Sequence, residues 1–107
     1  MILDELATAR TGDKGDTLIL AVFPRNKENF DQLVAEVTEQ RMAEHFGHTV
    51  TGPVQRTVLP QLPGMVFRLP GVLGGGVTGA PTLDGHGKCL SSYALLLPLG
   101  ITPPERR

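Results

Sequence analysis

The 107-residue sequence contains one cysteine, one tyrosine and no tryptophan. A single cysteine excludes an internal disulfide bond and a cysteine-based zinc cluster. Cys89 is followed by Leu90 and stands close to the apolar run 94–97. We therefore expect its thiol to behave as a small buried hydrophobic group rather than as a nucleophile.

An excess of charge is also missing, because the formal net charge is −1 and the basic residues are scattered. A nucleic-acid surface needs a concentrated basic face, so we expect no nucleic-acid partner. No apolar run approaches the roughly 20 residues that cross a bilayer, and no targeting segment opens the chain. We therefore expect a cytoplasmic protein with no membrane contact.

Turn-forming residues, in contrast, are abundant, with 13 glycines and 9 prolines gathered mostly after residue 52. Without a repeat period they indicate short elements separated by turns. The length is that of one domain. We expect this domain to span 1–107, with a frayed tail at 102–107.

The first half of the chain predicts two strands joined by a polar loop. Residues 2–9 alternate imperfectly between apolar and polar, which favours a first strand. Residues 17–23 form a continuous apolar run that ends at Pro24, as in a central strand covered on both faces. If these strands pair, residues 10–16 form an oversized hairpin connection.

Two helices follow. Asn26 is a good N-cap for a helix that runs to about residue 37, and Thr38 can cap a second helix over 39–46. Gly47 is the expected left-handed stop. The apolar stripes of the two helices differ in phase, so we expect a break or kink at Thr38.

The second half is more ambiguous. Residues 50–60 suggest a third strand, which the prolines at its two ends confine to an edge or bound. Residues 61–73 fit a short helix beginning at Pro63 or a short strand. Asp84-Gly85 suggests a hairpin turn, and residues 93–97 suggest another interior strand.

These elements predict an α+β fold. We expect an antiparallel sheet of four to five strands with two to three helices packed on one face.

The densest polar chemistry lies at the N-terminal end, in Arg10, Thr11, Gly12, Asp13, Lys14, Gly15 and Asp16. Glycines at these spacings let backbone N–H groups converge on an anion, which the two bases would meet. Alternatively, Arg10–Asp13 and Lys14–Asp16 ion pairs simply fasten a hairpin. The string has neither the spacing of a phosphate-binding Walker loop nor that of a calcium loop.

A second candidate is the run Gly74, Gly75 and Gly76, which permits close approach by a ligand or by another part of the backbone. It precedes a predicted strand rather than a helix, so dinucleotide binding is not expected. His45 and His48 flank Gly47 and would not share a helix face. We predict no metal site.

Several motifs resemble one family. Residues 9–17, Ala-Arg-Thr-Gly-Asp-Lys-Gly-Asp-Thr, are similar to the opening of the AtuA-like ferredoxin-fold domain. Further similar segments follow in the same order: 38–42 with Phe46, Leu59-Pro60 with Leu62 and Phe67, 73–77, and Asp84 with Gly87-Lys88. The sequence departs from the family's pattern at Leu18-Ile19, Val66, Gly79 and Thr82.

The resemblance implies a ferredoxin-like fold and an association with the breakdown of acyclic terpenoids or related acyl-CoA compounds. It carries no established reaction for a free-standing small domain. A larger AtuA-type subunit, which is fused to this domain in long family members, would here be a separate chain.

Two hypotheses about function follow. In the first, the protein is an accessory subunit, homo-oligomeric or docked on a larger AtuA-type subunit. In the second, the loop from Arg10 to Asp16, with the glycine run opposite, is an acyl-CoA- or phosphate-binding or catalytic site. Lys14 would then bind the anion, and Asp13 or Asp16 would act as base or metal ligand. No cofactor is predicted, and a CoA-type ligand fits the second hypothesis.

Overall fold

A computed structural model describes residues 1–74 and 88–100 of the chain. The predicted turn at Asp84-Gly85, the glycines at 75 and 76 and the tail 102–107 lie outside these residues. The described elements follow one another as η1 (Leu3–Glu5), β1 (Ala7–Lys14), β2 (Thr17–Pro24), η2 (Lys27–Asn29), α1 (Phe30–Glu36), α2 (Glu39–Phe46), η3 (Gly47–Thr49), β3 (Gln55–Leu59), β4 (Gly64–Leu69) and α4 (Lys88–Ala94).

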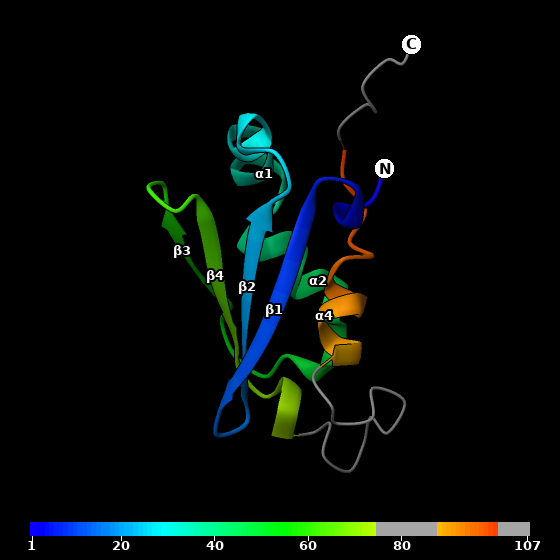
Figure 1. Cartoon of the computed structure of the whole chain (residues 1–107). Helices are drawn as coiled ribbons and strands as arrows, with labels where there is room; N and C mark the ends of the chain where they lie inside the picture. The colour runs from blue at the N-terminus through cyan, green and yellow to red at the C-terminus, as the bar shows by residue number, and fades with distance from the viewer. Residues whose placement is uncertain (75–87, 101–107) are drawn as a thin grey trace.

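The four described strands form one antiparallel sheet in the order β1-β2-β4-β3 (Figure 1). Starting from β2, the chain passes through the helices α1 and α2 to the hairpin β3–β4 and then to α4. In space, β1 then lies beside β2 and completes the sheet. This is the ferredoxin-like β-α-β-β-α-β arrangement, with its closing strand moved to the start of the chain.

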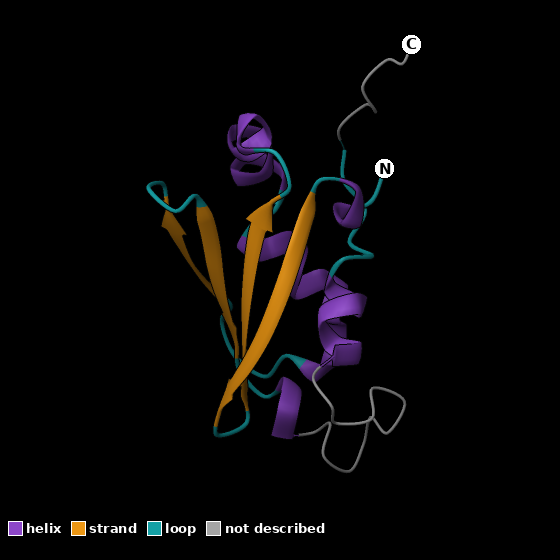
Figure 2. Ribbon diagram, viewed as in Figure 1, coloured by secondary structure: helices purple, strands orange, loops and turns teal. Residues whose placement is uncertain are grey.

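The helices cover one face of this sheet, and α2 and α4 lie next to each other there (Figure 2). The core between the layers is apolar, and among the described residues it includes Leu33 of α1, Met42 of α2 and Leu90 of α4. The predicted α+β fold, with an antiparallel sheet and helices on one face, is confirmed.

The two faces of β2 differ in burial. Leu18, Leu20 and Val22 are fully or almost fully buried against the helices, whereas Ile19 and Ala21 are only half-buried. The prediction that both faces of this strand are covered was wrong, because no helix within 1–74 or 88–100 lies over its second face. A continuous apolar run does not by itself tell how many layers pack against a strand.

The first strand also begins later than predicted. Residues 3–5 form the short helix η1, and β1 runs through the segment predicted to be a loop, up to Lys14. Only Gly15 and Asp16 remain as the turn, because Lys14 pairs directly with Thr17. The oversized hairpin connection was therefore wrong. Polar residues extend an edge strand readily when one of its faces is open to solvent.

The two predicted N-caps are confirmed, with Asn26 capping the short helix η2 that leads into α1. The Asn26 side chain accepts a hydrogen bond from the Glu28 N–H (2.9 Å), and the Thr38 hydroxyl accepts one from the Arg41 N–H (3.1 Å). The helical conformation is interrupted at Thr38, between α1 and α2, as predicted. Gly47 ends α2 with the expected positive φ of 62°, although its ψ of −137° is not that of a left-handed helix.

Arg56 of β3 stabilises the break between these helices. Its side chain reaches under the end of α1, where Nη1 donates to the carbonyl oxygens of Val34 (2.7 Å) and Val37 (2.8 Å). Carbonyls at a helix end have no partner within the helix, so a basic donor satisfies them. The backbone N–H of Arg56 donates to the Glu39 carboxylate (2.8 Å), which covers part of the sheet's outer edge.

The two ambiguous segments of the second half are now assigned. Within 61–73, residues Gly64–Leu69 form the strand β4 rather than a helix. The predicted interior strand at 93–97 was wrong, because Lys88–Ala94 is the helix α4. Leu90, Ala94 and Leu97 are buried at helical spacing, and a short apolar run fits either element.

Helix α4 is held by a reciprocal contact with α2. His45 Nε2 lies 2.6 Å from the Tyr93 carbonyl oxygen, and the Tyr93 hydroxyl donates to the His45 carbonyl oxygen at 2.5 Å. Since a carbonyl only accepts, His45 Nε2 must carry a proton. The two rings also stack, with centroids 4.3 Å apart. His45 therefore serves helix packing.

The two ends of the described chain are clasped together. The Leu3 N–H donates to the Leu97 carbonyl oxygen (2.9 Å), and the Leu99 N–H donates to the Met1 carbonyl oxygen (2.9 Å). This clasp lies at the Ala7 end of β1, and the Gly15 turn lies at the opposite end of the sheet (Figure 1).

Candidate functional site

The uncovered face of the sheet, called here the open face, carries the candidate site. Strand alternation and register place these residues on it: Thr8, Arg10, Gly12, Lys14, Thr17, Ile19, Ala21, Phe23, Gln55, Thr57, Leu59, Val66 and Arg68. The set includes three cations and no carboxylate. The open face is therefore electropositive, although the net charge of the whole chain is −1.

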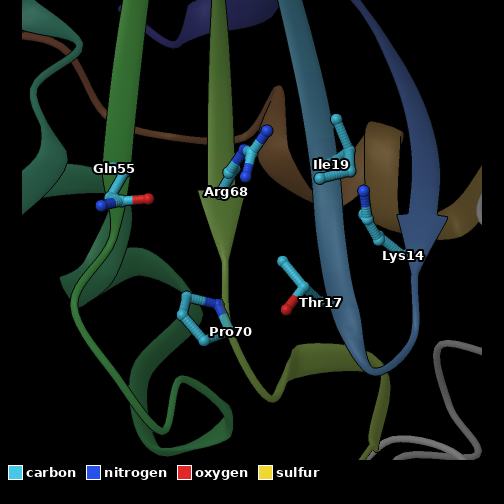
Figure 3. A pocket seen from close by; sticks show the side chains of 6 residues that line it. All are labelled: Lys14, Thr17, Ile19, Gln55, Arg68 and Pro70. Carbon is cyan, nitrogen blue, oxygen red and sulfur yellow. The ribbon is translucent and has the colours of Figure 1, made fainter.

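Two of these cations line a hollow of about 160 Å³, here named the basic hollow (Figure 3). Its walls are Lys14, Thr17, Ile19, Gln55, Arg68 and Pro70. In Figure 3 the Lys14 and Arg68 side chains rise on either side of Ile19, with Thr17 between the strands below them.

Register explains why residues so distant in sequence meet here. The pairs Ile19–Arg68 and Arg68–Gln55 form one row across β2, β4 and β3. Lys14 enters from β1 because the two-residue turn pairs it with Thr17. Gly15, at the first turn position, has a φ of 64°, as the favoured two-residue hairpin turns require.

Neither cation of the basic hollow forms an ion pair with a carboxylate within residues 1–74 and 88–100. Among the described residues, the ion pairs are Arg25–Asp4 and Arg41–Glu36. The predicted Arg10–Asp13 and Lys14–Asp16 pairs were therefore wrong. Arg10 and Asp13 are three positions apart in a strand and so point to opposite faces.

The predicted loop is thus divided by the sheet. Arg10, Gly12 and Lys14 lie on the open face, and Thr11 and Asp13 lie on the helix side. Gly12 faces open space, since a Cβ built there would have no neighbour within 4 Å. The backbone of this segment is extended up to Lys14, so its successive N–H groups point in opposite directions and do not form the converging nest of the second hypothesis.

The turn and the start of the glycine run do meet, as the second hypothesis required. The Leu73 N–H donates to the Asp16 carbonyl oxygen (3.0 Å), and a Cβ on Gly74 would lie only 2.7 Å from the Asp16 Cβ. Gly74 therefore permits close packing rather than ligand entry at this contact. Gly75 and Gly76 lie outside the described residues.

Sequence reasoning missed Arg68 and Gln55. Arg68 was overlooked because residues 61–73 fitted a short helix and a short strand equally, so the face on which Arg68 lies could not be predicted. The alternation from Met65 to Leu69, with Arg68 as its exposed member, was the available signal. It would have placed Arg68 on the face opposite Phe67, but not beside Lys14.

The opposite end of the open face is apolar. We call the open-face residues Ala21, Phe23, Leu59 and Val66, together with Leu62 of the turn after β3, the apolar end. The Phe23 ring lies over Gly64, where a Cβ would be 2.8 Å from it. Leu62, in the turn after β3, is 64% exposed, and its N–H donates to the Leu59 carbonyl oxygen (3.2 Å). An exposed leucine beside half-buried apolar groups is typical of a contact surface.

No described helix has both the length and the apolar character needed to span a bilayer. Comparison with curated proteins and with solved structures gave no significant match. The family model of the AtuA ferredoxin-like domain matches residues 1–100. Two departures from the family's pattern, Ile19 and Val66, both lie on the open face. Since the match covers nearly the whole chain, the protein belongs to the AtuA ferredoxin-like domain family.

Proposed function

We propose that this protein is an accessory, self-associating subunit and that the apolar end of its open face docks a second copy of the chain. The observation that carries the proposal is the solvent exposure of Leu62, 64%, in the turn that follows Leu59, next to an open face that no described element covers. Burying apolar surface stabilises association by about 25 cal/mol per Å² before the costs of ordering are subtracted.

The charge distribution favours a particular arrangement of the two copies. The five residues of the apolar end include no ionisable group, and the nearest cation in the strand register is Arg10, which pairs with Ala21 at its margin. Lys14 and Arg68 lie toward the other end of the sheet. A two-fold contact centred on Phe23 and Leu59, away from these three cations, limits like-charge repulsion and closes as a dimer.

The family resemblance supports an accessory role in the breakdown of acyclic terpenoid or acyl-CoA compounds. A larger AtuA-type subunit is the competing occupant of the same surface. In that case the small chain would remain monomeric alone, and the apolar end would be covered only in the complex.

Sedimentation velocity of the full chain, from low to high micromolar concentration, tests the proposal. We expect a monomer–dimer equilibrium that Leu62→Glu shifts to monomer. The matched control is Leu96→Glu, because Leu96 is the other large exposed apolar residue described, 53% exposed and outside the open face. This control should dimerise like the wild type.

Two results would overturn the proposal. One is a wild-type protein that stays monomeric at every concentration. The other is a dimer that Leu62→Glu leaves intact although its circular dichroism spectrum shows a native fold. Equal losses from both glutamate variants would indicate unspecific association through exposed apolar groups.

A further inference from the structure

We infer that the basic hollow binds a small oxyanion, a phosphate or carboxylate group of a soluble ligand. This goes beyond the proposed assembly role and uses the other end of the open face. Nothing in the contact between two apolar ends requires Lys14 or Arg68, so their presence in the wall of one hollow needs a separate explanation.

The charges of the hollow are the first argument. Lys14 and Arg68 both line it, and neither has a carboxylate partner among the described residues. Arg68 offers a planar fork that matches the two oxygens of a carboxylate or phosphate, whereas Lys14 offers a compact point charge. An anion in the hollow would be attracted by both cations, which stand on either side of Ile19.

The neutral walls are the second argument. Thr17 contributes a hydroxyl and Gln55 an amide, each able to donate a hydrogen bond to an oxygen of the ligand. Ile19 and Pro70 add apolar surface between them. These apolar walls shape the hollow, while both cations remain exposed to solvent, which weakens their attraction for an anion.

The size of the hollow limits what it holds. Its volume of about 160 Å³ is below the roughly 300 Å³ at which sites for drug-sized ligands begin. It would hold a head group and leave the remainder of a larger molecule in solvent. A phosphate of a CoA-type compound meets this description, as does the carboxylate of a small acid.

The two aspartates that neighbour Lys14 in the sequence do not fill the hollow. Asp13 precedes Lys14 but lies on the helix side of β1, and Asp16 packs against Gly74. Neither residue lines the hollow. Their charges reduce the positive potential around Lys14, so we expect weak binding that falls further as salt is added.

This site adjoins the proposed dimer contact on the open face, because Ile19 and Arg68 of the hollow are each two residues from Ala21 and Val66 of the apolar end. The far ends of the two surfaces are better separated, since Thr17 and Phe23 lie six residues apart along β2, which at about 3.3 Å per residue corresponds to about 20 Å. A dimer contact centred on Phe23 would therefore leave the Thr17 side of the hollow accessible.

The test is a titration of the full chain followed by heteronuclear NMR, with inorganic phosphate, acetate and CoA as separate probes at low ionic strength. We expect saturable shifts of the amide signals of Thr17, Gln55 and Arg68. Arg68→Gln and Lys14→Gln should each weaken binding about five- to tenfold, since each removes a charged hydrogen-bond donor.

Two matched controls accompany these variants. Lys27→Gln removes an exposed lysine of η2 outside the hollow, and Arg10→Gln removes a cation of the open face that does not line it. The first should leave affinity unchanged, and the second should weaken it less than twofold through long-range charge. All four variants should keep the wild-type unfolding midpoint.

The probes also identify the ligand class. Saturation by phosphate and CoA but not by acetate assigns a phosphate site, and the reverse result for acetate assigns a carboxylate site. The inference fails if no probe saturates the wild type, or if Lys27→Gln weakens binding as much as Lys14→Gln. Repeating the titration with Leu62→Glu separates the two proposals, because loss of dimer should not alter anion binding.

Discussion

The two faces of the sheet are built from the same strands, yet they follow different rules. On the helix side, Leu20 and Phe67 are completely buried, and their packing holds the layers together. On the open face, their sequence neighbours Ile19 and Arg68 are half-buried and exposed. One strand therefore carries stability on alternate residues and candidate binding groups on the residues between them.

The strongest test of this division compares two neighbours of β2. Leu20→Ala should lower the free energy of unfolding by about 3 kcal/mol, because it leaves a cavity in a packed core. Ile19→Ala should cost less than about 1 kcal/mol, because solvent already reaches this side chain. Urea denaturation monitored by circular dichroism measures both. Equal losses would mean that the open face is covered.

A smaller loss of unfolding free energy is expected when Arg56, a charged residue on the helix side of β3, is replaced. Arg56→Met should lower the free energy of unfolding by about 2 kcal/mol, because two helix-end carbonyls lose their donor. Thr57→Ala is the control, since Thr57 is the next residue and points to the open face. Its change should stay within about 0.5 kcal/mol in the same urea titration. A loss from Arg56→Met no larger than that of the control would contradict the helix-end role.

The smallest effect concerns the contact between Gly74 and Asp16 in the turn that joins β1 to β2. Gly74→Ala should cost about 1 kcal/mol, since its Cβ would meet the Asp16 side chain. Asp16→Gly removes that side chain, so the double variant should be more stable than the sum of the single changes predicts. Thermal unfolding of the wild type and the three variants measures this coupling. Strict additivity would show that the two residues do not meet.

Most elements of the fold could be predicted from the sequence, because their signals depend on neighbouring residues. The side chain of Thr38 caps a helix next to it, and the run 17–23 is apolar throughout, so these elements were readable. The segment 93–97 was misassigned because apolar side chains suit a helix end and a strand equally. Tertiary packing, through the His45–Tyr93 contact, accompanies the helix.

The candidate site was less accessible from sequence. The dense string from Arg10 to Asp16 pointed to the right hairpin, and Lys14 was among its candidates. However, the segment was predicted as a loop, whereas it is a strand up to Lys14, and a strand directs alternate side chains to opposite faces. Arg68 is 54 positions from Lys14. Only the strand order β1-β2-β4 brings these two residues to one hollow.

The clasp between residues 1–4 and 95–99 has a practical consequence for how the molecule is handled. Both segments lie at the Ala7 end of β1, on the side of the sheet where Phe23 pairs with Thr8. An affinity tag or a fused domain attached at residue 1 would therefore lie at the same end of the sheet as Phe23 and at the opposite end from the Gly15 turn. Immobilised protein would suit measurements of anion binding, whereas measurements of self-association call for an untagged chain.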